Sequence, residues 1–342
     1  MTVVSLSDAK WSCSSCGDCC KGFSFGPVEE HVVSGLMAAK IEDIWHPSRQ
    51  GWVEKSVDGE WFFKQVSGHC VFLREDNLCA IHDLLGESAK PWFCREYPFH
   101  LVREPRGVAV RVREDCGGYY KSFSSGHTVQ DSAQALLSLP RIVPVQSILD
   151  RTIIIGPGLG VSAENWVEVE PLLLQRVKDA PDIHRAVNSI RSAIDQMTGR
   201  DSKISTPFRQ IYLEILTGVK ARIESQSNLP NRFRTAREDM LLFLSRASRE
   251  PEGRYTPEAH DFWSVVLRGR ILGKRFAAFG GLPSGIGLSL FEFHLLSGKS
   301  SPMTLEGLGP SLSQWRRALM APPFWELLRS YQNQFSALYF CA

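Results

Sequence analysis

The feature that most constrains this chain is a group of thiols near its start. The segment WSCSSCGDCCKG holds four cysteines within eight positions, and Cys19 and Cys20 are adjacent. Adjacent cysteines pair with each other only in a strained ring, so they suit two metal sites or two faces of one cluster better than a disulfide. The two-residue spacing of Cys13, Cys16 and Cys19 lets a looped backbone place three thiolates around one soft metal ion or iron–sulfur cluster.

The cysteines are confined to one part of the chain. Of the nine in 342 residues, eight fall within the first 116 and are candidate metal ligands: Cys13, Cys16, Cys19, Cys20, Cys70, Cys79, Cys94 and Cys116. We expect Cys341, beside the C-terminus, to be incidental. The start of the chain lacks the basic and apolar regions of a secretory signal, which predicts a cytoplasmic location, where thiols stay reduced. Metal binding or redox catalysis is then favoured over disulfides.

The downstream cysteines are expected to complete the site that the first group begins. Cys70 and Cys79 flank VFLREDNL, which predicts a strand, a polar turn and a return strand that bring the two thiols together. AIHDLLGES then predicts a short helix that ends at Gly86, ahead of Cys94.

The roles of three other side chains near these cysteines remain open. His69 and His82 can ligate a metal as neutral imidazoles, although a surface position is favoured for each. Arg95 follows Cys94 directly. It suits either a hydrogen bond to a cluster sulfur or an anionic substrate, or a salt bridge to Glu96.

The eight thiolates are enough for two four-ligand metal ions, or for one 4Fe–4S cluster with further ligands or a redox pair. The spacing favours an iron–sulfur cluster over zinc, because it lacks the paired Cys-x2-Cys knuckles of structural zinc ribbons. It is also not the bacterial ferredoxin run, which places its fourth cysteine three residues on and follows it with proline.

Several motifs in order resemble a known family. CSSCGDCC, CVFLREDNLCAIH, KPWFCREYPF and CGG are similar to the bacterial CxxCxxCC cysteine-cluster proteins, described as zinc- or iron-chelating domains and thought in many cases to hold an iron–sulfur cluster. The resemblance covers about residues 11–120 and implies the same eight cysteine ligands.

LCAIHDLLGES is also similar to the flagellin lysine-N-methylases. That resemblance implies a cysteine cluster joined to a helical C-terminal region, S-adenosylmethionine as methyl donor and a protein substrate as partner. The sequence therefore leaves open whether the chain is an enzyme, either a protein-lysine methyltransferase or an iron–sulfur oxidoreductase, and it assigns no catalytic residue.

Beyond the cysteines the sequence turns helical. PDIHRAVNSIRSAIDQMTG predicts a helix begun by Asp182 and stopped by Gly199, with an apolar stripe from Ile183 to Met197. The expected fold class is α+β, mostly α: an irregular cysteine-rich metal module over residues 1–124 and a helical domain over residues 125–342.

Capping residues predict two further helix starts and one helix break. Thr235 and Glu238 have the spacing of a capping box, and Thr256 with Pro257 marks another N-terminus. Pro322 and its neighbouring proline should interrupt the last helical stretch.

Two segments have a second interpretation. RTIIIGPGLGVS, residues 151–162, is compatible with a nucleotide or methyl-donor site, but a plain turn is favoured because no helix opens at the third glycine. Arg268, Arg270, Lys274 and Arg275 form a basic stretch that faces either an acidic partner or, as we expect, solvent.

Charge and hydropathy exclude two classes of partner. The 39 basic and 37 acidic residues nearly cancel, so no nucleic-acid partner is expected. The most apolar stretch, residues 276–296, is interrupted by glycines, a proline, Glu292 and His294. It predicts buried structure and not a membrane span, and no membrane partner is expected.

Overall fold

The computed structural model describes residues 2–21, 25–45, 51–139, 144–199, 206–230, 233–247, 255–297 and 303–341. The strands are β1 (Val3–Val4), β2 (Lys10–Trp11), β3 (Phe25–Val28), β4 (Val53–Lys55), β5 (Trp61–Phe63), β6 (Gln65–Val66), β7 (His69–Cys70), β8 (Phe99–Glu104), β9 (Gly107–Val112), β10 (His127–Thr128), β11 (Gln146–Ser147), β12 (Ile153–Gly156) and β13 (Leu159–Val161).

The helices of the cysteine-rich part are α1 (Glu30–Ala38), α2 (Ile41–Ile44), α3 (Ala80–Leu85), α4 (Trp92–Glu96) and α5 (Gly117–Ser122), with short 3-10 helices η1 (Asp18–Cys20) and η2 (Glu87–Ala89). Those that follow are α6 (Val129–Leu137), α7 (Ala163–Lys178), α8 (Ile183–Thr198), α9 (Phe208–Ser225), α10 (Arg234–Arg246), α11 (Pro257–Leu272), η4 (Arg275–Phe279), α12 (Leu282–Ser297), α13 (Leu305–Leu319), α14 (Pro322–Arg329) and α15 (Gln332–Cys341). The predicted class, α+β and mostly α, is confirmed.

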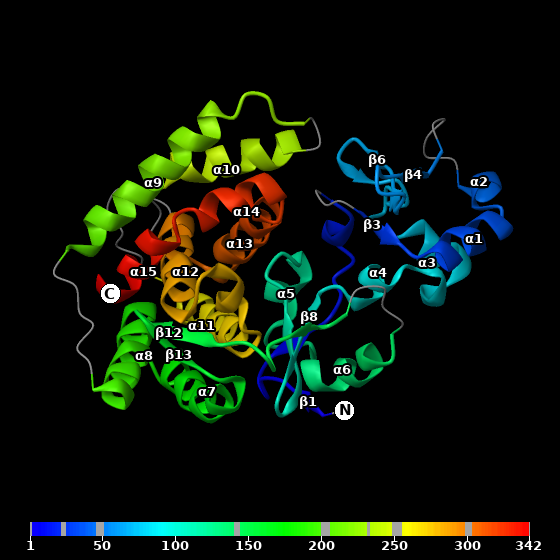
Figure 1. Ribbon diagram of the computed structural model, residues 1–342. Coiled ribbons are helices and arrows are strands. Elements are labelled where there is room, and N and C mark those ends of the chain that lie inside the picture. The colour runs from blue at the N-terminus through cyan, green and yellow to red at the C-terminus, as the bar shows by residue number, and fades with distance from the viewer. Residues whose placement is uncertain are drawn as a thin grey trace.

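The apolar side chains form two separate cores. The smaller core is built from residues between Val28 and Ile81, and its elements lie at the right of Figure 1. The larger core joins the first strand, the β8–β9 hairpin and all the later helices. Residues 99–124 thus pack with the helical part. The predicted boundary between residues 124 and 125 stays a prediction, because packing alone does not say which parts fold independently.

The sheet of the larger core lies between the cysteine-rich part and the helices. Its order is β1-β9-β8-β11, in which β8 and β9 form an antiparallel hairpin and β1 and β11 add parallel edges. β9 leads through residues 113–116 into α5, so the sheet carries the last cluster cysteine, Cys116, against the helical part.

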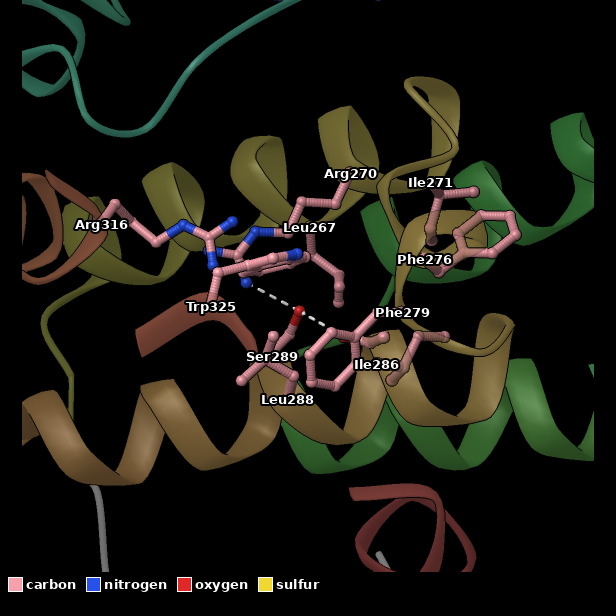
Figure 2. A pocket seen from close by; sticks show the side chains of 11 residues that line it. Leu267, Arg270, Ile271, Phe276, Phe279, Ile286, Leu288, Ser289, Arg316 and Trp325 are labelled. Atoms are coloured by element: carbon pink, nitrogen blue, oxygen red, sulfur yellow. Dashed lines mark hydrogen bonds between the residues drawn. The ribbon is translucent and has the colours of Figure 1, made fainter. Parts of the chain in front are cut away.

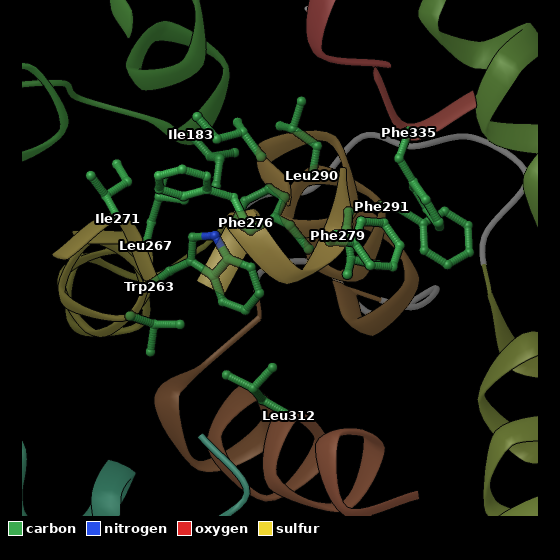
Figure 3. Close-up of a cluster of buried hydrophobic side chains, with 14 of the residues drawn as sticks. Ile183, Trp263, Leu267, Ile271, Phe276, Phe279, Leu290, Phe291, Leu312 and Phe335 are labelled. Atoms are coloured by element: carbon green, nitrogen blue, oxygen red, sulfur yellow. The ribbon is translucent and has the colours of Figure 1, made fainter. Parts of the chain in front are cut away.

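Helix α12 forms the centre of the larger core. All of its residues except Gly285 are buried, as expected for a helix that is apolar on every side. Figure 3 shows aromatic side chains from α11, η4, α12 and α15 converging there. The backbones of α12 and α15 nearly touch at Gly287, where an added Cβ would lie 1.6 Å from the carbonyl oxygen of Phe335. The expectation of buried structure over residues 276–296 is thus confirmed.

Most predicted helix ends are observed. The Asp182 side chain accepts a hydrogen bond from Arg185 N at the start of α8, and Gly199 ends that helix in the left-handed conformation. Thr256 caps α11 in the same way through Ala259 N. α14 begins at Pro322, where the break was expected.

Other local predictions were wrong. The capping box at Thr235 is not formed, because α10 begins earlier, at Arg234, with Phe233 as its N-cap. Met197 is 45% exposed and lies off the buried stripe of α8. Residues 151–162 form the β12–β13 hairpin, which agrees with the favoured plain turn.

The basic stretch after residue 267 does not face solvent. Arg268, Arg270 and Lys274 are 5%, 5% and 1% exposed, so the expectation of a solvated helix face was wrong. Each pairs with carboxylates of this chain: Arg268 with Asp8, Arg270 with Glu114 and Glu292, and Lys274 with Glu104 and Glu170. These acidic partners are distant in sequence, and no local pattern indicates them. The side chain of Arg275 lies outside what the structure describes.

No helix in the described part of the chain combines the length and the apolar character needed to cross a membrane.

Candidate metal centre

Five of the eight predicted ligands line one cavity of about 480 Å³. They come from four separate segments of the sequence, Cys19 with Cys20, Cys70, Cys79 and Cys94. The fold thus gathers thiols that are as much as 75 positions apart. This convergence is the main structural feature of the cysteine-rich part.

Short, irregular elements hold these thiols in place. Cys19 and Cys20 end η1, which is entered through Gly17 in the left-handed conformation at φ 69°. An added Cβ at Gly17 would lie 2.9 Å from Cβ of Asn77, so the turn requires glycine for both conformation and space.

The second group sits on the ends of small elements. Cys70 ends β7, Cys79 is the N-cap of α3, and Cys94 lies within α4. A single bridge pairs Leu73 with Cys79. The expected hairpin between Cys70 and Cys79 is therefore a tight turn closed by one bridge, and its two thiols line the cavity as the sequence suggested. α3 ends at Gly86, as predicted.

The thiols crowd one another. The Sγ atoms of Cys19 and Cys20 lie 3.9 Å apart. The hydrogen bond with Cys20 and burial raise the pKa of Cys19 well above its usual range. For Cys20, the hydrogen bond with Cys19 lowers the pKa, but the hydrogen bond with Cys70 and burial outweigh it and the net pKa is raised.

The pKa of Cys94, in another part of the cavity wall, is raised as well. Burial, and then repulsion from Cys20, raises the pKa of Cys94 well above the ordinary thiol value. These cysteines are consequently held as neutral thiols. A bound cation would supply the charge that allows them to ionise.

The rest of the cavity wall is largely aromatic. Phe63, Phe72, Trp92, Phe93 and Tyr97 contribute rings, and the Arg113 guanidinium lies 5.3 Å from the centre of the Tyr97 ring. The Tyr97 ring therefore forms part of the cavity wall.

Part of the wall comes from the helical part of the chain. Phe233, at the N-cap of α10, and Met320, Ala321 and Pro322, at the junction of α13 and α14, all line the cavity. These residues were missed, because nothing in the sequence links the junction to the cysteines. The proline break at 322 is the one local signal that an irregular segment lies there. Near the cavity, the ion pair of Asp18 with Arg317, 3.1 Å long, joins η1 to α13.

The other three predicted ligands lie outside the cavity. Cys116 is buried and its Sγ accepts a hydrogen bond from Trp11 Nε1 at 3.4 Å. Burial raises its pKa to about 12, and the nearby Cys16 adds to the shift. Cys16 Sγ would lie 3.3 Å from a Cβ added at Gly117, so it sits beside Cys116, whereas Cys13 is exposed. The eight cysteines therefore divide into a group of five and a smaller group.

Neighbouring candidate side chains do not join the cavity wall. His69 and His82 are exposed, as favoured from sequence, and neither lines the cavity. The Nε atom of Arg95 is buried without a hydrogen-bond partner among the described residues.

The donor set suits a soft metal, although the sulfur atoms are spread around the cavity wall. Within the described ranges, no three histidine, cysteine or acidic side chains are arranged as the ligands of one metal ion. Thiols without competing hard ligands are the donors that zinc and iron–sulfur clusters prefer. The chemistry of the site therefore fits such a metal, and its ligands would have to close around it.

Comparison with protein families agrees with this chemistry. Residues 12–117 match the model of the CxxCxxCC family, described as "Putative zinc- or iron-chelating domain". The matched region contains all eight predicted ligands and ends one residue after Cys116. The similarity to flagellin lysine-N-methylases is not shown by this match and stays a prediction. Searches of curated proteins and of solved structures found no match.

Proposed function

We propose that this protein holds an iron–sulfur centre in the cysteine cavity of its CxxCxxCC domain, and that the centre serves a redox or other metal-dependent reaction. The observation that carries the proposal is the convergence of five thiols from four segments on one cavity. Cys19, Cys20, Cys70, Cys79 and Cys94 are the proposed ligands. Cys13, Cys16 and Cys116 are retained from the sequence as candidates for a second, smaller site.

The cavity size supports a cluster more than a lone ion. About 480 Å³ is far more space than one metal ion occupies, and five thiols exceed the four ligands of a structural zinc site. When bound, an iron–sulfur cluster would supply one-electron chemistry, and the aromatic wall would limit its contact with water.

Zinc is the alternative that the vicinal pair favours. Two sulfur ligands of one tetrahedral zinc stand about 3.8 Å apart, given a Zn–S bond of about 2.3 Å. The Sγ atoms of Cys19 and Cys20 are 3.9 Å apart, so both can bind one ion. Metal and acid-labile sulfide analysis with an absorption spectrum, on protein purified without oxygen, separates the two. Iron with matching sulfide supports the cluster, and zinc without sulfide replaces it.

Methyl transfer from S-adenosylmethionine to a protein substrate is the second candidate function. The cavity wall combines the CxxCxxCC domain with Phe233 and Met320 of the helical part, which is where we expect a methyl donor to bind. Equilibrium dialysis of metal-loaded protein with S-adenosylmethionine tests this. Absence of binding would eliminate the methylase hypothesis and leave the metal proposal intact.

A further inference from the structure

A second cavity, of about 190 Å³, lies beside the cysteine cavity and is lined mostly by charged groups. We call it the arginine cavity, after Arg111, Arg113 and Arg316 in its wall. Arg113 and Met320 line both cavities, so the two are neighbours. The metal centre proposed above does not involve this second cavity.

The two carboxylates in its wall are already engaged. Asp115 accepts both arms of the Arg113 fork, from Nε at 3.0 Å and from Nη2 at 2.6 Å. Glu114 accepts from Arg111 Nη1 at 2.8 Å and from Arg270 Nε at 3.0 Å. Neither acid is therefore free to repel an incoming anion strongly.

Behind this wall, positive charge is in excess. Arg111, Arg270 and Arg316 share only Glu114 and Glu292, and all five side chains are buried. Figure 2 shows Arg270 and Arg316 lining a small cavity of about 20 Å³, where Arg270 donates a hydrogen bond to Ser289. Three guanidiniums against two carboxylates leave one positive charge without an acidic partner in this network.

Within this network, Arg111 Nε and Arg270 Nη2 are buried without a hydrogen-bond partner among the described residues. Arg111 is 4% exposed. Burial, together with repulsion from Arg316 and Arg270, outweighs the attraction of Glu114 and lowers the pKa of Arg111. A buried network with an excess of positive charge is destabilising unless an anion balances it.

We infer that the arginine cavity binds a small oxyanion, a carboxylate or phosphate group, which pairs with Arg111 and Arg316. Guanidinium forks match the two oxygens of such groups, and one negative charge balances the network. Met320, which is 36% exposed, gives the cavity an edge at the surface. The anion binds next to any molecule that occupies the cysteine cavity.

The test is isothermal titration of the full chain with inorganic phosphate and, separately, with acetate, at fixed ionic strength. Saturable binding is expected for one of the two, and its preference identifies the group. Met320→Trp fills the cavity while keeping every charge, and should weaken binding by about tenfold or more. Met320→Ala, which leaves the cavity open, should bind as the wild type does.

Two further variants separate the site from general charge effects. Arg111→Lys keeps the charge but loses the fork, so binding should weaken by about tenfold, the effect of about 1.4 kcal/mol. Lys90→Met removes a cation that lines only the cysteine cavity and should change nothing. The inference is overturned by wild-type protein that binds neither anion at millimolar concentration, by unchanged binding in Met320→Trp, or by an equal loss in Lys90→Met.

The titration is run on metal-free and on metal-loaded protein. Binding in both forms is expected, because the arginines do not depend on the metal. Binding that appears only with metal, and survives Met320→Trp, would place the anion on the metal and contradict the inference. The metal proposal would stand in that case.

Discussion

The two cores of this protein differ in whether their buried polar groups are paired with groups of opposite charge. In the larger core, buried acids and bases pair with each other: Glu292 accepts from Trp315, Arg316 and Arg270, each at 3.0 Å or less. Beside the smaller core, polar sulfurs crowd one another, and the pKa values of Cys19, Cys20 and Cys94 are all raised.

The difference indicates what each region needs in order to be complete. Side chains of this chain neutralise most of the charge in the larger core, whereas the thiols beside the smaller core have raised pKa values and would need a bound cation in order to ionise. The smaller core also has far fewer buried residues than the larger core, and it depends on short elements such as α3 and α4. We therefore expect the stability of the cysteine-rich part to depend on metal and that of the helical part to be independent of it.

Metal removal should have the largest effect on this contrast. Structural zinc supplies about 10–16 kcal/mol in small zinc-finger peptides, and part of such a free energy should hold the cysteine-rich module here. Chelation, or Cys19→Ser, should increase proteolysis and amide exchange within residues 11–120 first, with α12 still protected. Cys341→Ser is the matched control and should have no effect. An unchanged protease pattern after metal removal would contradict the prediction.

Disruption of the larger core should destabilise the helical part of the chain and leave metal binding unchanged. Glu292→Gln leaves the buried Arg270 and Arg316 with only Glu114 as a shared carboxylate and should lower the free energy of unfolding by about 3 kcal/mol, measured in urea. Metal content should not change. Glu326→Gln breaks an exposed ion pair with Arg329 and should cost almost nothing. If Glu292→Gln lost its metal, the two regions would not be independent.

Acid should weaken the larger core through His294. Burial, and then the neighbouring His184, lowers the pKa of His294 to about 3, while the unfolded chain titrates near 6.5. The unfolded state then binds more protons between these values, so stability falls as the pH drops from 6.5 towards 3. At pH 4 the loss should be about 3 kcal/mol. Urea unfolding of His294→Phe, which cannot titrate, should show a smaller decline, and an identical decline would exclude His294 as the cause.

Alkali should weaken the cysteine-rich part when it is metal-free. The pKa values of Cys20 and Cys94 are raised in the folded chain, so the unfolded thiols ionise first and stability falls above about pH 8.5. Each thiol contributes at most about 1.4 kcal/mol per pH unit. Bound metal should abolish the decline, because the thiolates are then already formed. Amide exchange of residues 69–94 at pH 8 and 10, with and without metal, tests this, and an alkaline decline that persists with metal would oppose it.

The features that were predicted correctly from the sequence are those that depend on nearby residues. Asp182 and Gly199 define α8, Thr256 begins α11, and the order of the cysteine motifs indicated a CxxCxxCC domain. These features depend on neighbours within a few positions, where backbone hydrogen bonds and spacing determine the outcome.

What the sequence did not reveal depends on distant partners. Lys274 meets Glu104 and Glu170, which lie more than 100 positions earlier, so its burial follows from tertiary packing alone. The same holds for Met320, which reaches the cysteine cavity from the far end of the chain. The division of eight cysteines into five and three likewise follows from folding, because spacing alone treats Cys13 and Cys19 alike.

Metal content per chain shows whether the thiols of the cysteine cavity hold a metal. Protein purified without oxygen should be analysed for iron, zinc and acid-labile sulfide, alongside Cys94→Ser and Cys341→Ser. We predict stoichiometric metal, with iron and sulfide in matching amounts, in the wild type and in Cys341→Ser, and a marked loss in Cys94→Ser. Wild-type protein that contains no metal and takes up neither zinc nor iron, or Cys94→Ser that retains full metal content, would contradict this prediction.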